Sequence, residues 1–321
     1  TPGQLDIKWR DLVENEPSRF INRDGTVKLD ILRNFRNLSI FIPDLPAGAL
    51  SPGNPLALLS GGHRGSRRLL IENYGLLKER GYLPLLQKYP ASLVGNPNLF
   101  HYQGCQYTQR WTKHIYSLGL FKKSLEGCLP SEFTALDLGS SYGIFSYLLK
   151  KEYPDSHHIL VDFPEQLTLA HYFLGMNFPE ARIATLQDVK DITGFSRNDI
   201  RRYDFVLLPW FYYPRLRNRS ADLFMNFASF GEMRRDWFNF YVRADVFQGS
   251  RFLFMMNRFC SAPTYDSDLT ALDYPFADFR KIHYGIWPFS YHTYARKHFF
   301  LTEKVPFSSQ YFEFVGERVT A

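Results

Sequence analysis

Apolar residues change their periodicity along the chain. Before about residue 95 they recur at helical spacing in segments broken by Pro and Gly, as in LDILRNFRNL and RRLLIENYGLLKERGYLPLLQKYP. After Pro130, short apolar runs alternate with helical stretches such as EQLTLAHYFLGM. The pattern predicts a helical accessory region at residues 1–95 and a larger α/β domain at residues 96–321.

Five apolar runs of the second region have the length of buried strands. They cover residues 134–139, 157–164, 203–210, 221–230 and 250–260. Two further runs, KHFFLTEK and QYFEFVGERV, lie close together near the end and predict a hairpin. We therefore expect a mostly parallel sheet with helical crossovers, closed by a C-terminal antiparallel hairpin at its edge.

A glycine-rich turn separates the first of these strands from a helix. The stretch TALDLGSSYGIFSYLLKK places Asp137, Gly139, Ser141 and Gly143 at alternate positions. This spacing misses both the dinucleotide pattern G-x-G-x-x-G and the phosphate loop G-x-x-x-x-G-K-[ST]. It fits the S-adenosylmethionine (SAM) turn, acidic-x-Gly-x-Gly-x-Gly, with Ser141 at the middle glycine. A tight packing corner in another Rossmann-like domain is the alternative.

An acidic residue at the end of the second strand supports the SAM turn. Asp162 follows Asp137 by 25 residues, where a carboxylate can accept hydrogen bonds from ribose hydroxyls. The turn and this acid together predict a Rossmann-like class I SAM methyltransferase fold. Four further candidates for the cofactor site follow the third and fourth strands: Pro209, Trp210, Asn226 and Ser229. Trp210 can equally belong to the core, and Ser229 can be a helix N-cap.

Several stretches resemble a family of sugar O-methyltransferases found with bacterial surface-polysaccharide genes. The similar stretches lie within residues 90–321 and are VGNP, ALDLGSSYGIFSYLL, ILVDFPEQLTLAHYFL, LFMNFASFGEM, FMMNRF and YFEFVGERV. The family usually has Gly where Ser141 stands. The resemblance implies SAM as methyl donor and a sugar, sugar-nucleotide or glycan hydroxyl as acceptor. A methyltransferase of a phenol, an amine or RNA, and an inactive SAM-fold interaction module, remain alternatives.

A sugar hydroxyl is weakly acidic, so its methylation calls for a general base or a metal. Glu232, in SFGEM just after the fourth strand, is the first candidate base; otherwise it is an acid favoured by a helix N-terminus. His283, in the aromatic segment KIHYGIWPFSYH, is the second, against a packed or surface histidine. The four aspartates of YDSDLTALDYPFAD match no metal loop, so we expect a polar loop and no metal site.

The stretch HYQGCQYTQRW supplies two candidate substrate contacts, Gln106 and Arg110. The guanidinium of Arg110 suits a SAM carboxylate or a sugar-nucleotide phosphate, or else lies on an ordinary surface.

The composition limits the partners and the cellular location that we expect for this chain. The net charge of +6 comes partly from small arginine groups that suit nucleic acid or phosphorylated substrates, but no RNA-binding module is recognisable, so we expect no nucleic acid partner. Three scattered cysteines indicate reduced thiols and a cytoplasmic protein. We expect no membrane span and no signal peptide. The first residue is Thr rather than Met, which indicates processing, truncation or a part of a larger polypeptide. A glycan-assembly complex is a further partner that the sugar acceptor leaves open.

Overall fold

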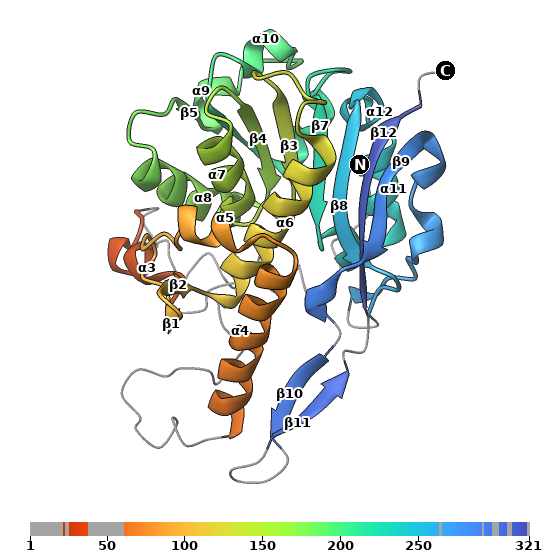
Figure 1. Ribbon diagram of the computed structural model, residues 1–321. Coiled ribbons are helices and arrows are strands. Elements are labelled where there is room, and N and C mark those ends of the chain that lie inside the picture. Colours follow the sequence, from red (N-terminus) through yellow and green to blue (C-terminus); the bar gives the residue numbers. More distant parts are fainter. Residues whose placement is uncertain are drawn as a thin grey trace. The chain divides into compact units, whose positions relative to one another are not determined.

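The computed structural model describes only part of the chain. The described residues are Asn22 and residues 26–37, 61–262, 265–290, 292–296, 302–306 and 310–319. They belong to two compact units (Figure 1). The larger unit comprises Thr1–Asp24, Lys123–Trp287 and Ser309–Ala321, and the smaller comprises Gly25–Lys122 and Pro288–Ser308.

The larger unit is built on an eight-stranded sheet with the order β5-β6-β4-β3-β7-β8-β12-β9. Its strands are β3 (Thr134–Leu138), β4 (His157–Asp162), β5 (Ile183–Ala184), β6 (Phe205–Pro209), β7 (Leu223–Phe227), β8 (Phe252–Arg258), β9 (Phe279–Ile286) and β12 (Tyr311–Arg318). Among these strands β12 alone is antiparallel to its neighbours; it pairs with β8 and β9 in that sense. The remaining pairs are parallel.

This strand order identifies the fold. The short edge strand β5 is left out, and the other seven strands of the sheet are numbered 1 to 7 along the chain. Their order across the sheet is then 3-2-1-4-5-7-6, and strand 7, which is β12, is antiparallel to its neighbours. That arrangement is the class I SAM methyltransferase fold. The predicted fold class is therefore confirmed, including an antiparallel strand contributed by the C-terminal part of the chain.

The pairing of the last strands differs from the predicted hairpin. Strand β11 (Thr302–Pro306) pairs with β10 (His292–Arg296) in the smaller unit, whereas β12 inserts between β8 and β9. The predicted hairpin was wrong because residues 279–286, where no strand was predicted, form the edge strand β9 and pair with β12. Most side chains of β9 are exposed or half-buried, so this strand lacks the continuous apolar run that marks the inner strands.

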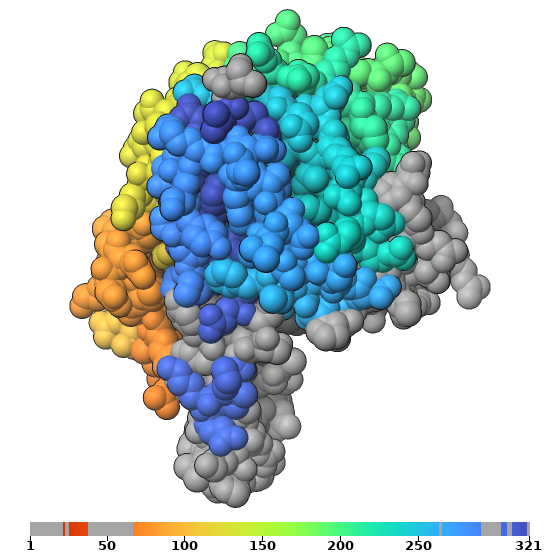
Figure 2. All heavy atoms as spheres, turned by 90° about the vertical axis from the view of Figure 1, so that its right-hand side faces the viewer, coloured from red at the N-terminus to blue at the C-terminus, as the bar shows by residue number. Residues whose placement is uncertain are grey.

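Helices cover both faces of the sheet. The helical elements of the larger unit are α7 (Ile144–Glu152), α8 (Pro164–Asn177), α9 (Leu186–Val189), α10 (Arg197–Ile200), η2 (Trp210–Arg215), η3 (Phe230–Glu232), α11 (Arg235–Val242), α12 (Asp245–Gly249), η5 (Ala271–Asp273) and η6 (Phe276–Asp278). On one face Phe145 of α7 packs on Phe227 and Phe254. On the other, Leu136 shares a buried cluster with Phe247 of α12. Residues of α11 and of the strands β9 and β12 also form part of the face in Figure 2.

The smaller unit combines helices with two short hairpins. Its elements are α3 (Leu29–Asn34), α4 (Gly61–Glu79), α5 (Leu83–Lys88), β1 (Phe100–Tyr102), β2 (Cys105–Tyr107), α6 (Gln109–Leu125, which runs on into the larger unit), η7 (Pro288–Ser290), β10 and β11. The indole of Trp111 donates to the Tyr89 carbonyl at 2.9 Å, and the Asn73 amide donates to Thr112 at 3.1 Å. In the part of the chain that is described, no helix has the length and apolarity needed to cross a membrane.

Candidate functional site

The candidate site lies where the parallel strands of the larger unit end. Leu138, Asp162, Pro209 and Phe227 are the last residues of β3, β4, β6 and β7, which are adjacent in the sheet. The carboxyl ends of parallel strands meet at one edge, which is where open α/β sheets bind their ligands. The glycine turn, Asp162, Trp210 and the segment with Glu232 therefore share this edge.

The turn after β3 has a left-handed backbone at three positions. The φ angles are +75° at Gly139, +52° at Ser141 and +80° at Gly143. A Cβ atom on Gly139 would lie 2.3 Å from Oγ of Ser229, and one on Gly143 would lie 2.9 Å from a methyl group of Leu160. Glycine is thus required at both ends of the turn. Ser141 adopts the conformation that a glycine takes more easily, so the turn keeps its shape despite the substitution.

Asp162 anchors this turn. The Ser141 amide donates to Oδ2 of Asp162 at 2.6 Å, and the Phe163 amide donates to Oδ1 at 2.7 Å. Burial raises the pKa of Asp162 to about 7, although these two amides favour its ionised form. Asp162 therefore both shapes the turn and holds a carboxylate at the end of β4.

Asp137 places a second carboxyl group near the first. It is buried within β3 and accepts a long hydrogen bond of 3.4 Å from the Ser146 hydroxyl. Burial raises its pKa to about 7, and the charge of Asp162 contributes to the same shift. Because both groups are costly to ionise, a ligand that brings hydroxyl donors or positive charge stabilises the ionised site.

The residues of the turn fit SAM. Each carboxylate oxygen of Asp162 accepts one backbone amide and has acceptor capacity for a ribose hydroxyl as well. Oγ of Ser140, inside the turn, is buried and has no hydrogen-bond partner among the described residues. Such orphaned buried groups are rare unless a ligand or water satisfies them. SAM is the cofactor that the fold implies, and this donor and acceptor set suits it.

The loop after β7 is tied directly to the turn. The Asn226 amide donates to the Leu138 carbonyl at 2.8 Å and to Oγ of Ser229 at 2.5 Å, and Ser229 itself donates to the same carbonyl at 3.1 Å. The oxygen of the Asn226 side chain accepts from the Phe230 amide at 3.0 Å. Asn226 and Ser229 thus hold the two loops together, and their contact with a cofactor remains a prediction.

Sequence reasoning missed Asn257. This buried residue of β8 donates to the Asn226 side-chain oxygen at 2.9 Å and accepts from the Gly231 amide at 3.1 Å. An uncharged polar residue within the apolar run FLFMMNRF was the available signal, since buried polar groups need partners. Asn257 completes the scaffold that carries the segment with Glu232.

Glu232 lies in a small polar cluster with residues of β8 and the following loop. Its Oε1 accepts a 2.9 Å hydrogen bond from the Tyr265 hydroxyl and lies 3.6 Å from Nη2 of Arg258. The Glu232 and Arg258 side chains are 19% and 16% exposed, so the pair is sheltered but reachable. The Arg258 guanidinium also lies over the rings of Tyr265 and Tyr311. Neither Tyr265 nor Arg258 was among the sequence candidates.

His283 lies elsewhere in the sheet. Its Nε2 is 2.9 Å from Oε1 of Glu313, which is buried on β12. Strands β12 and β8 separate β9 from β7, which Glu232 follows, so the structure does not bring the two base candidates together. His283 forms a separate histidine–carboxylate pair.

Pro209 and Trp210 close the carboxyl end of β6. Pro209 is buried, and Trp210 is half-buried with its ring edge-on to Trp237 of α11, at a centroid distance of 4.9 Å. The indole nitrogen of Trp237 is buried and has no hydrogen-bond partner within the described part of the chain. Contact of Pro209 and Trp210 with adenine remains a prediction.

The two candidate substrate contacts belong to the smaller unit. Gln106 is exposed on β2 and Arg110 is half-buried on α6, both in the smaller unit. Asp268 and Asp273 of the polar loop bind Arg235. No group of three His, Cys, Asp or Glu side chains within the described residues is arranged to hold a metal ion.

Comparisons with known proteins give only distant similarities. No family model and no curated protein matches the chain. Among solved structures, it is similar to YcgJ from Bacillus subtilis at 12% identity (64% of this chain, 99% of that chain, TM-score 0.42). It is also similar to TehB from Haemophilus influenzae at 10% identity (64% and 62%, TM-score 0.41). Fibrillarin, from a fibrillarin/NOP5P complex, matches at 14% identity (72% and 91%, TM-score 0.39).

At TM-scores this low, these similarities carry no argument about cofactor, substrate or residue roles. The fold is assigned from the strand order of this chain.

Proposed function

We propose that this protein is a SAM-dependent O-methyltransferase that acts on a sugar hydroxyl in glycan biosynthesis, in the cytoplasm. One relationship carries the proposal: the loop that bears Glu232 is anchored to the glycine turn. Ser229, three residues before Glu232, donates to the Leu138 carbonyl and fills the space beside Gly139. A carboxylate thus stands on the loop next to the turn assigned to the cofactor.

The chemistry follows from the groups at this edge. SAM, when bound, supplies a methyl group carried on a positively charged sulfur. An acceptor hydroxyl that takes this methyl must lose its proton, and we assign that proton to a carboxylate oxygen of Glu232. Tyr265 and Arg258 hold Oε1 of Glu232, so the carboxylate has a fixed direction before substrate arrives. Asp162 and the turn orient the cofactor.

The sugar acceptor rests on sequence resemblance. The stretches from ALDLGSSYGIFSYLL to YFEFVGERV are similar to those of sugar O-methyltransferases found with surface-polysaccharide genes. The aromatic residues and carboxylates along the loops of the larger unit suit carbohydrate, which offers both apolar faces and hydroxyl groups.

The alternatives gain no specific support. Several arginines that suit RNA binding are engaged within the fold: Arg197 pairs with Asp222, and Arg201 lies 3.4 Å from a carboxylate oxygen of Glu132. Ser141, which suggests an inactive module, leaves the turn in its left-handed geometry.

Methyl transfer to unmethylated glycan precursors tests the proposal. The purified protein and SAM are incubated with oligosaccharides from bacterial surface polysaccharides, and products are examined by mass spectrometry. We expect a gain of one methyl group on a sugar hydroxyl. SAM binding without transfer to any acceptor would favour the interaction module, and transfer only to RNA would overturn the sugar assignment.

A further inference from the structure

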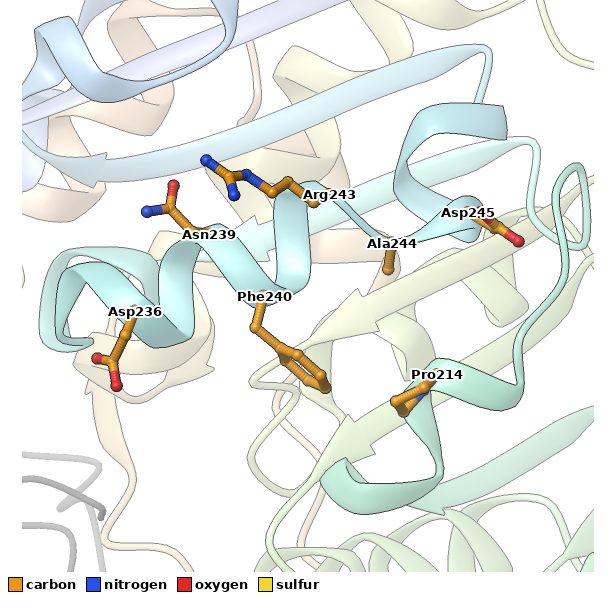
Figure 3. Close-up of a pocket in the computed structure, with 7 residues that line it drawn as sticks. All are labelled: Pro214, Asp236, Asn239, Phe240, Arg243, Ala244 and Asp245. Carbon is orange, nitrogen blue, oxygen red and sulfur yellow. The ribbon is translucent and has the colours of Figure 1, made fainter. Parts of the chain in front are cut away.

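Two adjoining hollows run along the outer side of α11. The first has a volume of about 650 Å³ and takes its walls from η2, α11 and the start of α12 (Figure 3). It is lined by Pro214, Asp236, Asn239, Phe240, Arg243, Ala244 and Asp245. The second, of about 530 Å³, is lined by Arg234, Arg235, Asp236, Asn239, Asp266 and Asp268.

The two hollows adjoin on α11, and the second is lined by Arg234 and Asp266, which are close in sequence to Glu232 and Tyr265. The hollows share Asp236 and Asn239 on the first two turns of α11, and we call the pair the groove. The second hollow reaches Asp266, the neighbour of Tyr265, whose hydroxyl binds Glu232. In Figure 2 the cyan atoms of the α11 region adjoin the light-blue atoms of the segment after β8. A chain lying in this groove would have one end near the candidate base.

The first hollow is lined by one partly exposed aromatic ring, that of Phe240. The Phe240 side chain is half-buried, and its ring points toward Pro214 in Figure 3. Neighbouring rings hold it in place: Trp237 at 5.8 Å and Tyr241 at 5.2 Å between centroids, both edge-on. An ordered ring that keeps part of its surface open provides apolar contact without a large loss of side-chain entropy.

Polar side chains without internal partners also line the first hollow, and in Figure 3 those of Asn239 and Arg243 leave α11 on the side away from the Phe240 ring. Within the described residues, the side chains of Asn239, Arg243 and Asp245 make no hydrogen bond or ion pair. They offer amide, guanidinium and carboxylate groups, which can donate to and accept from hydroxyls.

The charges of the groove argue against a polyanion. Its lining includes four carboxylates, at Asp236, Asp245, Asp266 and Asp268, against three guanidiniums, at Arg234, Arg235 and Arg243. Nucleic acid recognition depends on an excess of positive charge. Hydroxyl-rich chains need mixed donors and acceptors instead.

We propose that this groove binds a carbohydrate chain, so that the acceptor is an oligosaccharide or a growing glycan rather than a single sugar or sugar nucleotide. The inference deepens the proposed function and rests on it. Each hollow has the volume of a small-ligand site, about 300–1,000 Å³, so the pair extends over more than one sugar ring. Phe240 packs against a ring face, and Asn239, Arg243 and Asp245 bind hydroxyls.

Binding is tested without methyl transfer. The full chain is applied to an array of bacterial surface oligosaccharides of one to six sugar residues. Variants Phe240→Leu, which keeps an apolar side chain, and Arg243→Ala are compared with Arg202→Ala. Arg202 is exposed in the turn after α10, before β6, and lies outside the groove. Circular dichroism and SAM titration confirm that each variant is folded.

We expect the wild-type protein to bind four- to six-residue oligosaccharides at least tenfold more tightly than single sugars. The two groove variants should lose most of that preference, and Arg202→Ala should keep it. Wild-type protein that binds no oligosaccharide, or a preference unchanged in both groove variants, overturns the groove assignment. The proposed function fails separately, through absence of SAM binding or of methyl transfer to any sugar.

Discussion

The hydroxyl of Tyr265 donates a 2.9 Å hydrogen bond to Oε1 of Glu232. Tyr265 is buried, and burial together with the nearby charge of Glu232 raises the pKa of its phenol well above the usual value. The phenol therefore stays protonated near neutral pH and remains a donor. This bond gives the proposed base a fixed orientation.

Replacing Tyr265 by Phe should lower kcat by about ten- to a hundredfold, because the carboxylate loses its fixed direction together with a hydrogen bond to a charged group, which is worth about 1.5–3 kcal/mol. The effect should fall on kcat and leave the KM for the acceptor nearly unchanged, since the phenol orients the base and does not bind the substrate. SAM affinity should not change. Tyr274→Phe is the matched control, because the Tyr274 hydroxyl is buried without a hydrogen-bond partner among the described residues. Equal kcat values for both variants would remove Tyr265 from the role of positioning residue.

Asp162→Asn should weaken SAM binding by about 1.5–3 kcal/mol, the scale of hydrogen bonds to an ionised group. The amide keeps the size of the carboxyl group but only one acceptor oxygen, so one of the two backbone amides that bind Asp162 loses its partner, and circular dichroism must show that the variant is folded. Isothermal titration calorimetry measures the affinity, and exposed Asp155→Asn serves as the control. A folded Asp162→Asn protein with wild-type affinity would exclude this carboxylate from the cofactor site.

The buried pair Asp137 and Asp162 should make stability depend on pH. Both pKa values are raised from 3.8 to about 7, so the folded state binds these protons more tightly than the unfolded chain does. The two protonated groups contribute fully to the free energy of unfolding below pH 4, and this contribution is lost as the pH rises to about 7. Asp137→Asn should therefore gain stability relative to wild type as the pH rises from 5 to 7.

Urea denaturation of both proteins at each pH measures this difference, in which contributions from groups that do not interact with Asp137 cancel. A difference that is flat, or that falls with pH, would contradict the assignment.

Gly139→Ala should lower the free energy of unfolding of the larger unit by more than the strain of an alanine at positive φ alone. The new Cβ would lie 2.3 Å from Oγ and 2.5 Å from Cβ of Ser229. Gly127→Ala is the control: its φ of +79° is similar, but nothing lies within 4 Å of the added atom. The control should cost about 1–2 kcal/mol of unfolding free energy.

Gly139→Ala should cost more, and a second change, Ser229→Gly, should recover part of the loss. Equal costs for the two alanine variants would show that Ser229 does not restrict the turn.

The inner strands could be predicted because they are buried on both faces. The runs that contain β3 and β6 are almost continuously apolar, and every residue of both strands is buried. The glycine turn was recognisable because positive φ angles and a close contact restrict which residues fit at Gly139 and Gly143. The inner strands and the glycine turn could therefore be predicted, because burial and local backbone geometry restrict the residue types at these positions.

Long-range pairings could not be read in the same way. Tyr265 lies 33 residues beyond Glu232, inside a stretch whose aspartates suggest a polar loop. Likewise β9 has a mixed pattern because it is an edge strand, and its partner β12 begins 25 residues after β9 ends. Which side chains meet depends on the strand order, and no local pattern contains that information.

Single-turnover methyl transfer by Glu232→Gln tests the central claim most directly. The variant should keep its fold and SAM affinity but transfer methyl about 10²–10⁴-fold more slowly to the glycan acceptor, the usual contribution of a general base. Glu180→Gln, at an exposed carboxylate, and His283→Ala should stay close to the wild-type rate. Transfer by Glu232→Gln within a few-fold of wild type would contradict the account, and a collapse confined to His283→Ala would move the base to the His283–Glu313 pair.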